Sequence, residues 1–122
     1  MTMPQYAVAL TRRREIELDL ARLFSEIDVL LSPTSAIPAF VAEGPMPTVI
    51  NGRQAPLAGA VPFAMFCNMY GTPAVSVPAG STSGGLPVGI QIAGRRHADH
   101  EVLRLARLLE QARPWPRHAM SG

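Results

Sequence analysis

The 122-residue sequence predicts an α/β protein in which helices cover a sheet that is incomplete within this chain. Two observations predict the class: amphipathic patterns of helical period lie near both ends of the chain, and short apolar runs of strand length lie between them. A third observation predicts the incompleteness. Two long helices and one short helix cannot readily cover both faces of a three-stranded sheet, so at least one apolar edge should stay open. We therefore expect part of a larger α/β unit.

The first predicted element is a long helix near the N-terminus. Pro4 suits its first turn. Apolar side chains recur at three- and four-residue spacing on one face, which is the period of an amphipathic helix: Ile16, Leu20, Leu23, Phe24 and Ile27. Oppositely charged residues such as Arg13 and Glu17 are spaced to pair weakly across the helix surface. We therefore interpret the arginines at 12–14 as a solvated helix face rather than an anion or nucleic-acid site.

A buried strand is predicted directly after this helix. The run from Val29 to Leu31 is apolar without alternation, which is typical of a strand covered on both faces, and Pro33 ends it. Residues 32–35 would then lie at the carboxyl end of the strand. That edge is where open α/β sheets bind ligands.

A long irregular connection is predicted between Pro33 and about Pro62. Prolines and glycines recur through it, and Asn51-Gly52 is a strong turn signal. Connections of this length without structure of their own are uncommon inside a compact domain. We expect the segment to wrap around something that this polypeptide does not contain.

The next predicted elements are a short buried helix and two strands. Residues 63–70 are apolar, and Gly71 would end their helix. Residues 74–77 form one strand, which Pro78 stops, and residues 88–92 form the other. The connection between the two strands is too short for a parallel crossover, so they should pair antiparallel.

The last predicted element is an amphipathic helix that begins at an Asp99 N-cap and ends at Arg113 and Pro114. Its apolar face is made of Val102, Leu105, Ala106, Leu109 and Ala112. Trp115 and Pro116 are expected to fold the tail back onto the body.

The charge composition excludes several mechanisms. All 11 basic residues are arginine, so no lysine base, Schiff base or phosphate-binding lysine is present on this polypeptide. Residues 54–94 carry no charged side chain and no histidine, which predicts that much of this block is buried. The net charge of +2, from scattered arginines, does not favour a nucleic-acid partner.

The sequence also predicts a cytoplasmic location without membrane contact. Prolines interrupt the uncharged block before it could span a bilayer, and residues 1–10 lack the pattern of a signal peptide. Cys67 is the single cysteine, so no internal disulfide can form.

Three motifs that suggest chemistry have simpler interpretations. The loop at 80–85 is rich in glycine and serine, but a strand follows it and no lysine accompanies it, so a hairpin loop is favoured over a phosphate or nucleophile loop. His97 and His100 lack further metal ligands nearby. Cys67 lies in an apolar run that is typical of a core cysteine.

Four segments, taken in order, carry a resemblance. They are residues 28–34 (Asp-Val-Leu-Leu-Ser-Pro-Thr), residues 68–80, residues 85–94 (Gly-Leu-Pro-Val-Gly-Ile-Gln-Ile-Ala-Gly), and the terminal helix with Leu103, Leu105, Ala106 and Glu110. Together they resemble the C-terminal part of amidase-signature hydrolases. The preceding helix, with Tyr6, Ala9 and Arg14, is similar to that family as well.

This resemblance implies an α/β fold with a large mixed sheet between helices. It also implies hydrolysis or transfer of amide nitrogen by a serine nucleophile, a cis-serine and a lysine base, which lie in the family's N-terminal and central portion. Residues 1–122 are accordingly expected to be a C-terminal segment of an amidase-signature domain that lacks those parts, has no catalytic residue, and uses no cofactor or metal. The loop at 80–85 matches a later hairpin of the family and not its serine signature.

The same resemblance implies that this segment completes part of a substrate pocket. Pro33 and Thr34 would lie near the active-site edge, and Phe63, Met65 and Asn68 would line the pocket, with core packing as the alternative for each. The chain alone should be inactive. Its expected partner is the missing N-terminal amidase portion, or a second copy by self-association, and the complete enzyme would take a small amide substrate.

Three alternatives remain open from the sequence. The chain could be part of a glutamine-dependent amidotransferase, although the uncharged block offers no acidic group to hold an amino group. It could be a non-catalytic interaction module that reuses this fold and docks through its apolar edge. The weakest alternative is a module that binds anions or nucleic acid through its arginines.

Overall fold

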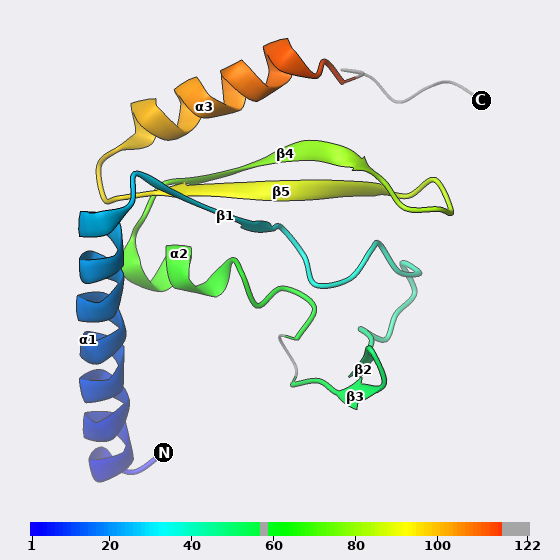
Figure 1. The fold of residues 1–122 in the computed structure, drawn as a ribbon. Helices are drawn as coiled ribbons and strands as arrows, with labels where there is room; N and C mark the ends of the chain where they lie inside the picture. The colour runs from blue at the N-terminus through cyan, green and yellow to red at the C-terminus, as the bar shows by residue number, and fades with distance from the viewer. Residues whose placement is uncertain (57–58, 116–122) are drawn as a thin grey trace.

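The computed structural model describes residues 1–56 and 59–115 (Figure 1). In chain order its elements are α1 (Met3–Glu26), β1 (Val29–Pro33), β2 (Val49–Ile50), β3 (Arg53–Gln54), α2 (Met65–Tyr70), β4 (Ala74–Ser81), β5 (Pro87–Gly94) and α3 (Asp99–Ala112). The α/β class is confirmed. Pro116, expected in the folded-back tail, lies outside the described residues.

The main sheet has the strand order β1-β5-β4, and both of its strand pairs are antiparallel. The predicted antiparallel pairing of the last two strands is confirmed. The prediction that Pro78 ends the first of them is wrong, because β4 continues to Ser81 through an irregularity between Pro78 and Gly80. Pro78 is tolerated because β4 is an edge strand, where a missing backbone N–H need not interrupt the ladder. Pro33 likewise belongs to the edge strand β1.

Helix α3 covers one face of this sheet (Figure 1). Val102 packs against Val77 and Ile92, and Ile92 is 0% exposed. The predicted apolar face of α3 is confirmed for Leu105, Ala106 and Leu109, which pack against the same cluster in turn. The Asp99 N-cap is wrong: Ala98 is the N-cap, and Asp99 is the first helical residue, where its charge still favours the positive end of the helix dipole.

Helix α1 begins with a capping box that the sequence analysis missed. The Gln5 backbone N–H donates to the Thr2 hydroxyl, and the Thr2 backbone N–H donates to the Gln5 side chain. Figure 1 shows α1 extending away from the sheet, and only its last turns meet the core. Phe24 is buried there with Cys67 of α2 and Ala93 of β5.

The expected burial of the uncharged block is wrong for this chain. Met65 is 46% exposed, and Leu86 and Val88 are exposed as well. The strand β1 is also only partly covered, since Leu31 is 51% exposed. Helix α3 covers one side of the three-stranded sheet, but the ends of α1 and α2 cover only part of the other side, so a complete second layer, which such apolar residues normally have, is missing.

The long connection after β1 contains one small hairpin that was not predicted as a hairpin. Strands β2 and β3 pair through the turn Asn51-Gly52, where both residues have positive φ, 49° and 73°. Two successive positive φ values are typical of the type I′ turn that Asn-Gly favours. Among the described residues, no helix is both long and apolar enough to cross a membrane.

Candidate functional site

A hollow of about 930 Å³ opens at the carboxyl end of β1, on the side of the sheet away from α3. Residues of β1, β4, β5 and the connection after β1 line it; they include Leu31, Pro33, Thr34, Ile37, Phe40, Met46, Val61, Ser76, Val88 and Gly89. We call this space the β1 hollow. It lies where the sequence analysis expected a ligand, next to residues 32–35.

A short hydrogen bond crosses the sheet inside the β1 hollow. The hydroxyl oxygens of Thr34 and Ser76 lie 2.6 Å apart, although the two residues belong to opposite sides of the central strand. They can meet because Gly89, between them on β5, has no side chain. A Cβ on Gly89 would lie 2.7 Å from Ser76 Oγ and 2.8 Å from Thr34 Oγ1. Glycine is therefore required here for close approach rather than for backbone conformation.

Backbone and side-chain bonds fix this end of the sheet. The Thr34 N–H donates to the Gly89 carbonyl over 3.0 Å, which holds the chain against β5 just past the end of β1. The buried Gln91 side chain donates to the Phe63 carbonyl over 2.8 Å and to Ser32 Oγ over 3.4 Å. These bonds tie the segment before α2 to the strands, and they satisfy an amide group that would otherwise be costly to bury.

The structure separates the five predicted site residues into two groups. Pro33 and Thr34 line the β1 hollow. Phe63 is half-buried just before α2, whereas Met65 and Asn68 lie exposed on α2, and none of these three lines the hollow. The carbonyl of Phe63 still contacts Gln91 of the same sheet.

Sequence reasoning missed Ser76 and Gly89 as site residues. Gly89 carried a usable signal, since a glycine inside an alternating strand often marks a close approach. Ser76 carried none, because its partner Thr34 is far away in sequence.

The β1 hollow suits binding rather than catalysis by this chain alone. None of the residues lining it is acidic or basic. Its polar groups are the hydroxyls of Ser32, Thr34, Ser35 and Ser76 and backbone atoms, and no ionisable base lies beside them to activate a nucleophile. Such a wall can exclude water and orient a neutral ligand through a few hydrogen bonds.

Cys67 is not a candidate nucleophile in this arrangement. Its side chain is buried between α1 and the sheet. Burial raises the pKa of the Cys67 thiol, and the hydroxyl of Thr72 lowers it only in part. The thiol is therefore protonated at neutral pH and unreactive. In the part of the chain that the structure describes, no group of His, Cys, Asp and Glu side chains could hold a metal ion.

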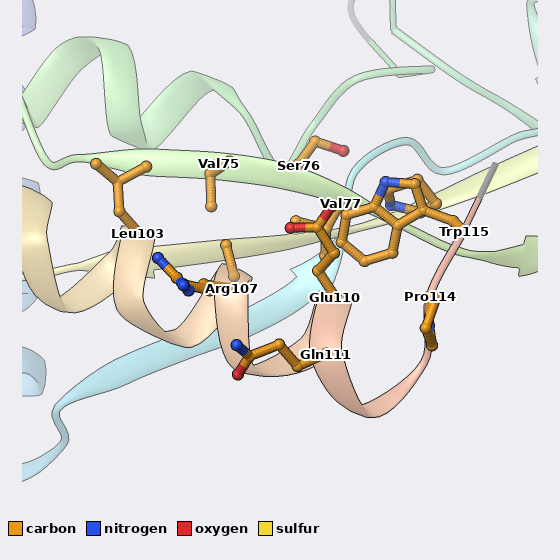
Figure 2. Close-up of a pocket in the computed structure, with 11 residues that line it drawn as sticks. Val75, Ser76, Val77, Leu103, Arg107, Glu110, Gln111, Pro114 and Trp115 are labelled. Atoms are coloured by element: carbon orange, nitrogen blue, oxygen red, sulfur yellow. The ribbon is translucent and has the colours of Figure 1, made fainter. Parts of the chain in front are cut away.

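A second hollow of about 850 Å³ lies between α3 and β4 (Figure 2). We call it the α3–β4 groove. Figure 2 shows Leu103 at one end, Trp115 at the other, and Arg107 and Glu110 of α3 between them. Val75 and Val77 of β4 form its floor. Unlike the β1 hollow, this groove carries charged side chains, so the two spaces differ in chemistry.

Comparison with known proteins places the chain in a clear context. The family model described as Amidase matches residues 2–103. The chain is 39% identical over 103 residues to a glutamyl-tRNA(Gln) amidotransferase subunit of Myxococcus xanthus, covering 81% of this chain and 19% of that protein. It is 37% identical over 105 residues to a fatty acid amide hydrolase of Arabidopsis thaliana, covering 84% of this chain and 17% of that protein.

Comparison with solved structures also finds proteins of this family. A bacterial aryl acylamidase of the amidase signature family superposes with a TM-score of 0.83 at 32% identity, over 94% of this chain and 24% of that protein. The corresponding glutamyl-tRNA(Gln) amidotransferase subunit of Thermotoga maritima superposes with a TM-score of 0.74 at 35% identity, over 92% and 23%. The chain thus spans about a fifth to a quarter of the length of the proteins it matches.

Proposed function

Since the chain belongs to the amidase family, we propose that it is the C-terminal portion of an enzyme that hydrolyses the carbon–nitrogen bond of amides. In this proposal residues 1–122 complete the fold and provide one wall of the substrate pocket. The observation that carries it is the β1 hollow, because an apolar, open space lies at the strand end where ligands of α/β sheets bind.

The proposal assigns catalysis to the portion of the enzyme that this chain does not contain. The family's lysine base has no counterpart here, since the sequence has no lysine and no ionisable residue lines the β1 hollow. An activated serine needs a base beside it. The chain would therefore act only together with the catalytic amidase portion, in the cytoplasm, and would turn over no amide alone.

The wall favours a neutral amide with an apolar substituent as substrate. Apolar residues such as Ile37, Phe40 and Val61 line the hollow, and the hydroxyls of Thr34 and Ser76 offer hydrogen bonds. Burying the ammonium and carboxylate of an amino-acid amide against this wall would cost several kcal/mol without a counter-charge. The uncharged hollow thus favours a hydrolase over the runner-up, part of a glutamine-dependent amidotransferase, which the Myxococcus and Thermotoga relatives suggest.

The test compares amide turnover by the chain alone and by a joined protein. In the joined protein, this chain replaces the matching segment of the Thermotoga maritima amidotransferase relative and is linked to the rest of that protein. Ammonia release from benzamide is measured for both. We expect turnover by the joined protein and none by the chain alone. Turnover by the homogeneous chain alone, or a folded joined protein that releases no ammonia, would overturn the proposal.

A further inference from the structure

The turn Asn51-Gly52 joins β2 and β3 in the small hairpin of the long connection (Figure 1). We propose that this turn is a site of spontaneous deamidation, at which the side-chain amide of Asn51 is converted to aspartate and isoaspartate with water as the co-reactant. The modification needs no catalytic residue, so the inference does not depend on the proposed function. The chain has two asparagines, Asn51 and Asn68, and only the surroundings of Asn51 permit the reaction.

The reaction is an attack by the backbone nitrogen of Gly52 on the side chain of Asn51, its neighbour in the chain. As this nitrogen bonds to Asn51 Cγ, the Cγ–Nδ2 bond breaks, and Nδ2 leaves as ammonia with the proton that the Gly52 nitrogen loses. The product is a five-membered succinimide ring. Water then opens the ring at either of its carbonyl carbons. One cleavage leaves aspartate in an ordinary backbone, and the other leaves isoaspartate, whose backbone runs through Cγ.

The backbone nitrogen of Gly52 is accessible for this attack. The register pairs Ile50 with Arg53, so the Gly52 N–H lies in the turn and outside the ladder between β2 and β3. A Cβ at Gly52 would meet nothing within 4 Å, so the surroundings of this residue are open. Glycine also has no side chain of its own to crowd the approach of its nitrogen to Asn51 Cγ. The nucleophile is therefore neither hydrogen-bonded in the ladder nor shielded.

The side chain of Asn51 is equally free to react. It is exposed, and within the part of the chain that the structure describes it has no hydrogen-bond partner. No contact therefore holds its amide away from the Gly52 nitrogen, and water can reach the ring that forms. Asn51 also has a φ of 49°, in the left-handed region that is unfavourable for residues other than glycine. The pairing of β2 with β3 is what keeps the backbone in this conformation.

The hairpin around the turn is small enough to open. Strands β2 and β3 are each two residues long, and a bond of 2.8 Å from the Ala55 N–H to the Thr48 carbonyl closes the base of the hairpin. Val49 of β2 is 57% exposed and both residues of β3 are exposed, so little packing supports the pairing. Such two-stranded hairpins are marginally stable in water. Ring closure requires the backbone at Asn51 to rotate out of the turn, and opening of the hairpin permits that rotation.

Asn68 has different surroundings, although its side chain is exposed as well. It lies within α2 and is followed by Met69 rather than by glycine. The Asn68 N–H donates to the Ala64 carbonyl, and the helix directs the Met69 N–H to the carbonyl one turn earlier, so that nitrogen is not free to attack. The neighbouring Cys67 is buried in the core, which holds this helix in place. Asn68 is therefore an internal control for Asn51.

Peptide mapping by mass spectrometry tests the inference, because trypsin separates the two asparagines. Cleavage after Arg22, Arg53 and Arg95 places Asn51 in residues 23–53 and Asn68 in residues 54–95. After incubation of the native chain at mildly alkaline pH, residues 23–53 should show the mass change from amide to acid in two products, at a rate within about tenfold of that in urea. Residues 54–95 should show no such change. No conversion at Asn51 in the native chain, or equal conversion at Asn68, would overturn the inference.

Two variants separate the ring chemistry from the opening of the hairpin. Asn51→Gln lengthens the side chain, so the five-membered ring cannot form and conversion in residues 23–53 should be lost. Val49→Cys combined with Gln54→Cys allows a disulfide between facing residues of the hairpin. Oxidation should slow conversion at Asn51 about tenfold relative to the reduced form of the same variant, because the disulfide restricts opening. Undiminished conversion in Asn51→Gln would contradict the proposed reaction, and equal rates in the oxidised and reduced forms would contradict the step through the open hairpin.

Discussion

The two faces of the sheet are built differently although the same strand supplies both. Toward α3, Ile92 and Val102 are closed in a packed cluster. On the opposite face, at the carboxyl end of β1, Gly89 sits under a hydroxyl bridge and the β1 hollow stays open. Alternation along β5 makes this division possible, since successive residues face opposite sides. The face toward α3, which we call the closed face, stabilises the fold. On the other face, which we call the open face, the cluster of α1 and α2 covers one end and the β1 hollow leaves the other end uncovered.

The largest expected effect lies on the closed face. Ile92→Ala removes a fully buried side chain and leaves a cavity, so the free energy of unfolding should fall by about 2–5 kcal/mol. Leu31→Ala is the control and should cost less than about 1 kcal/mol, because Leu31 pairs with Ile92 across the sheet but is 51% exposed at the edge strand. Urea unfolding followed by circular dichroism measures both. Equal losses would show that burial under α3 does not decide the cost of losing a side chain from this face.

A smaller loss of stability is expected from adding a side chain at Gly89, next to the hydrogen bond between the Thr34 and Ser76 hydroxyls, which we call the hydroxyl bridge. Gly89→Ala places a Cβ within 2.8 Å of both hydroxyl oxygens, so the bridge must open. This overpacking should lower the free energy of unfolding by about 1–3 kcal/mol. Gly84→Ala is the matched control, because its Cβ would meet only Thr82 Oγ1 at 3.8 Å. If the Gly84 variant loses as much stability as the Gly89 variant, close approach at Gly89 is not the cause.

The hydrogen bond between the hydroxyls of Thr34 and Ser76 should contribute less to the free energy of unfolding than the absence of a side chain at Gly89. Thr34→Val and Ser76→Ala each remove one hydroxyl of the 2.6 Å pair. In a double-mutant cycle, their coupling should be about 0.5–1.5 kcal/mol. Urea unfolding of the two single variants and the double variant measures it. Additive effects, with no coupling, would mean that the two hydroxyls do not stabilise the open face as a pair.

The smallest effect concerns the surface of α1, which takes part in neither face. The guanidinium of Arg14, with help from Arg13, lowers the pKa of Glu17 below its ordinary value. A lowered pKa means that the contribution of this carboxylate is present above the pKa of an unfolded glutamate and is lost as pH falls through the folded value.

An NMR titration of the Glu17 carboxyl carbon measures that shift. Arg14→Gln should move the pKa of Glu17 upward, toward its ordinary value. Arg12→Gln is the control, since Arg12 pairs with Glu15 and should leave Glu17 unchanged. Because this ion cluster lies on the helix surface, neither variant should alter the packing of the two faces. If the pKa of Glu17 is unchanged in the Arg14→Gln variant, the prediction is contradicted.

Sequence patterns predicted correctly those parts of the fold that depend on interactions between residues close together in the sequence. The periods of α1 and α3, the helix end at Gly71 and the antiparallel pairing of β4 with β5 depend on neighbours in sequence, and all are confirmed. Thr34 and Pro33 were placed near a ligand site from their position after a strand, and both line the β1 hollow.

The features that were missed or mistaken depend on what lies across the sheet. Pro78 does not end β4, because the sheet edge removes the cost that proline has elsewhere. The burial of the uncharged residues 54–94 was overestimated. Apolar composition shows that a residue can be buried, but it does not show whether another element covers it. Met65 and Asn68 lie exposed on α2, away from the hollow, since only the packing of α2 against α1 fixes where they point.

The central claim is that the open face is the wall that touches an amide substrate. Mapping NMR shifts in the joined protein during titration with benzamide tests it most directly. The account predicts shifts at the amides of Thr34, Ser76 and Gly89, around the β1 hollow, with none at Leu103 or Trp115 in the α3–β4 groove. Shifts confined to Leu103 and Trp115, with the β1 hollow unchanged, would contradict it.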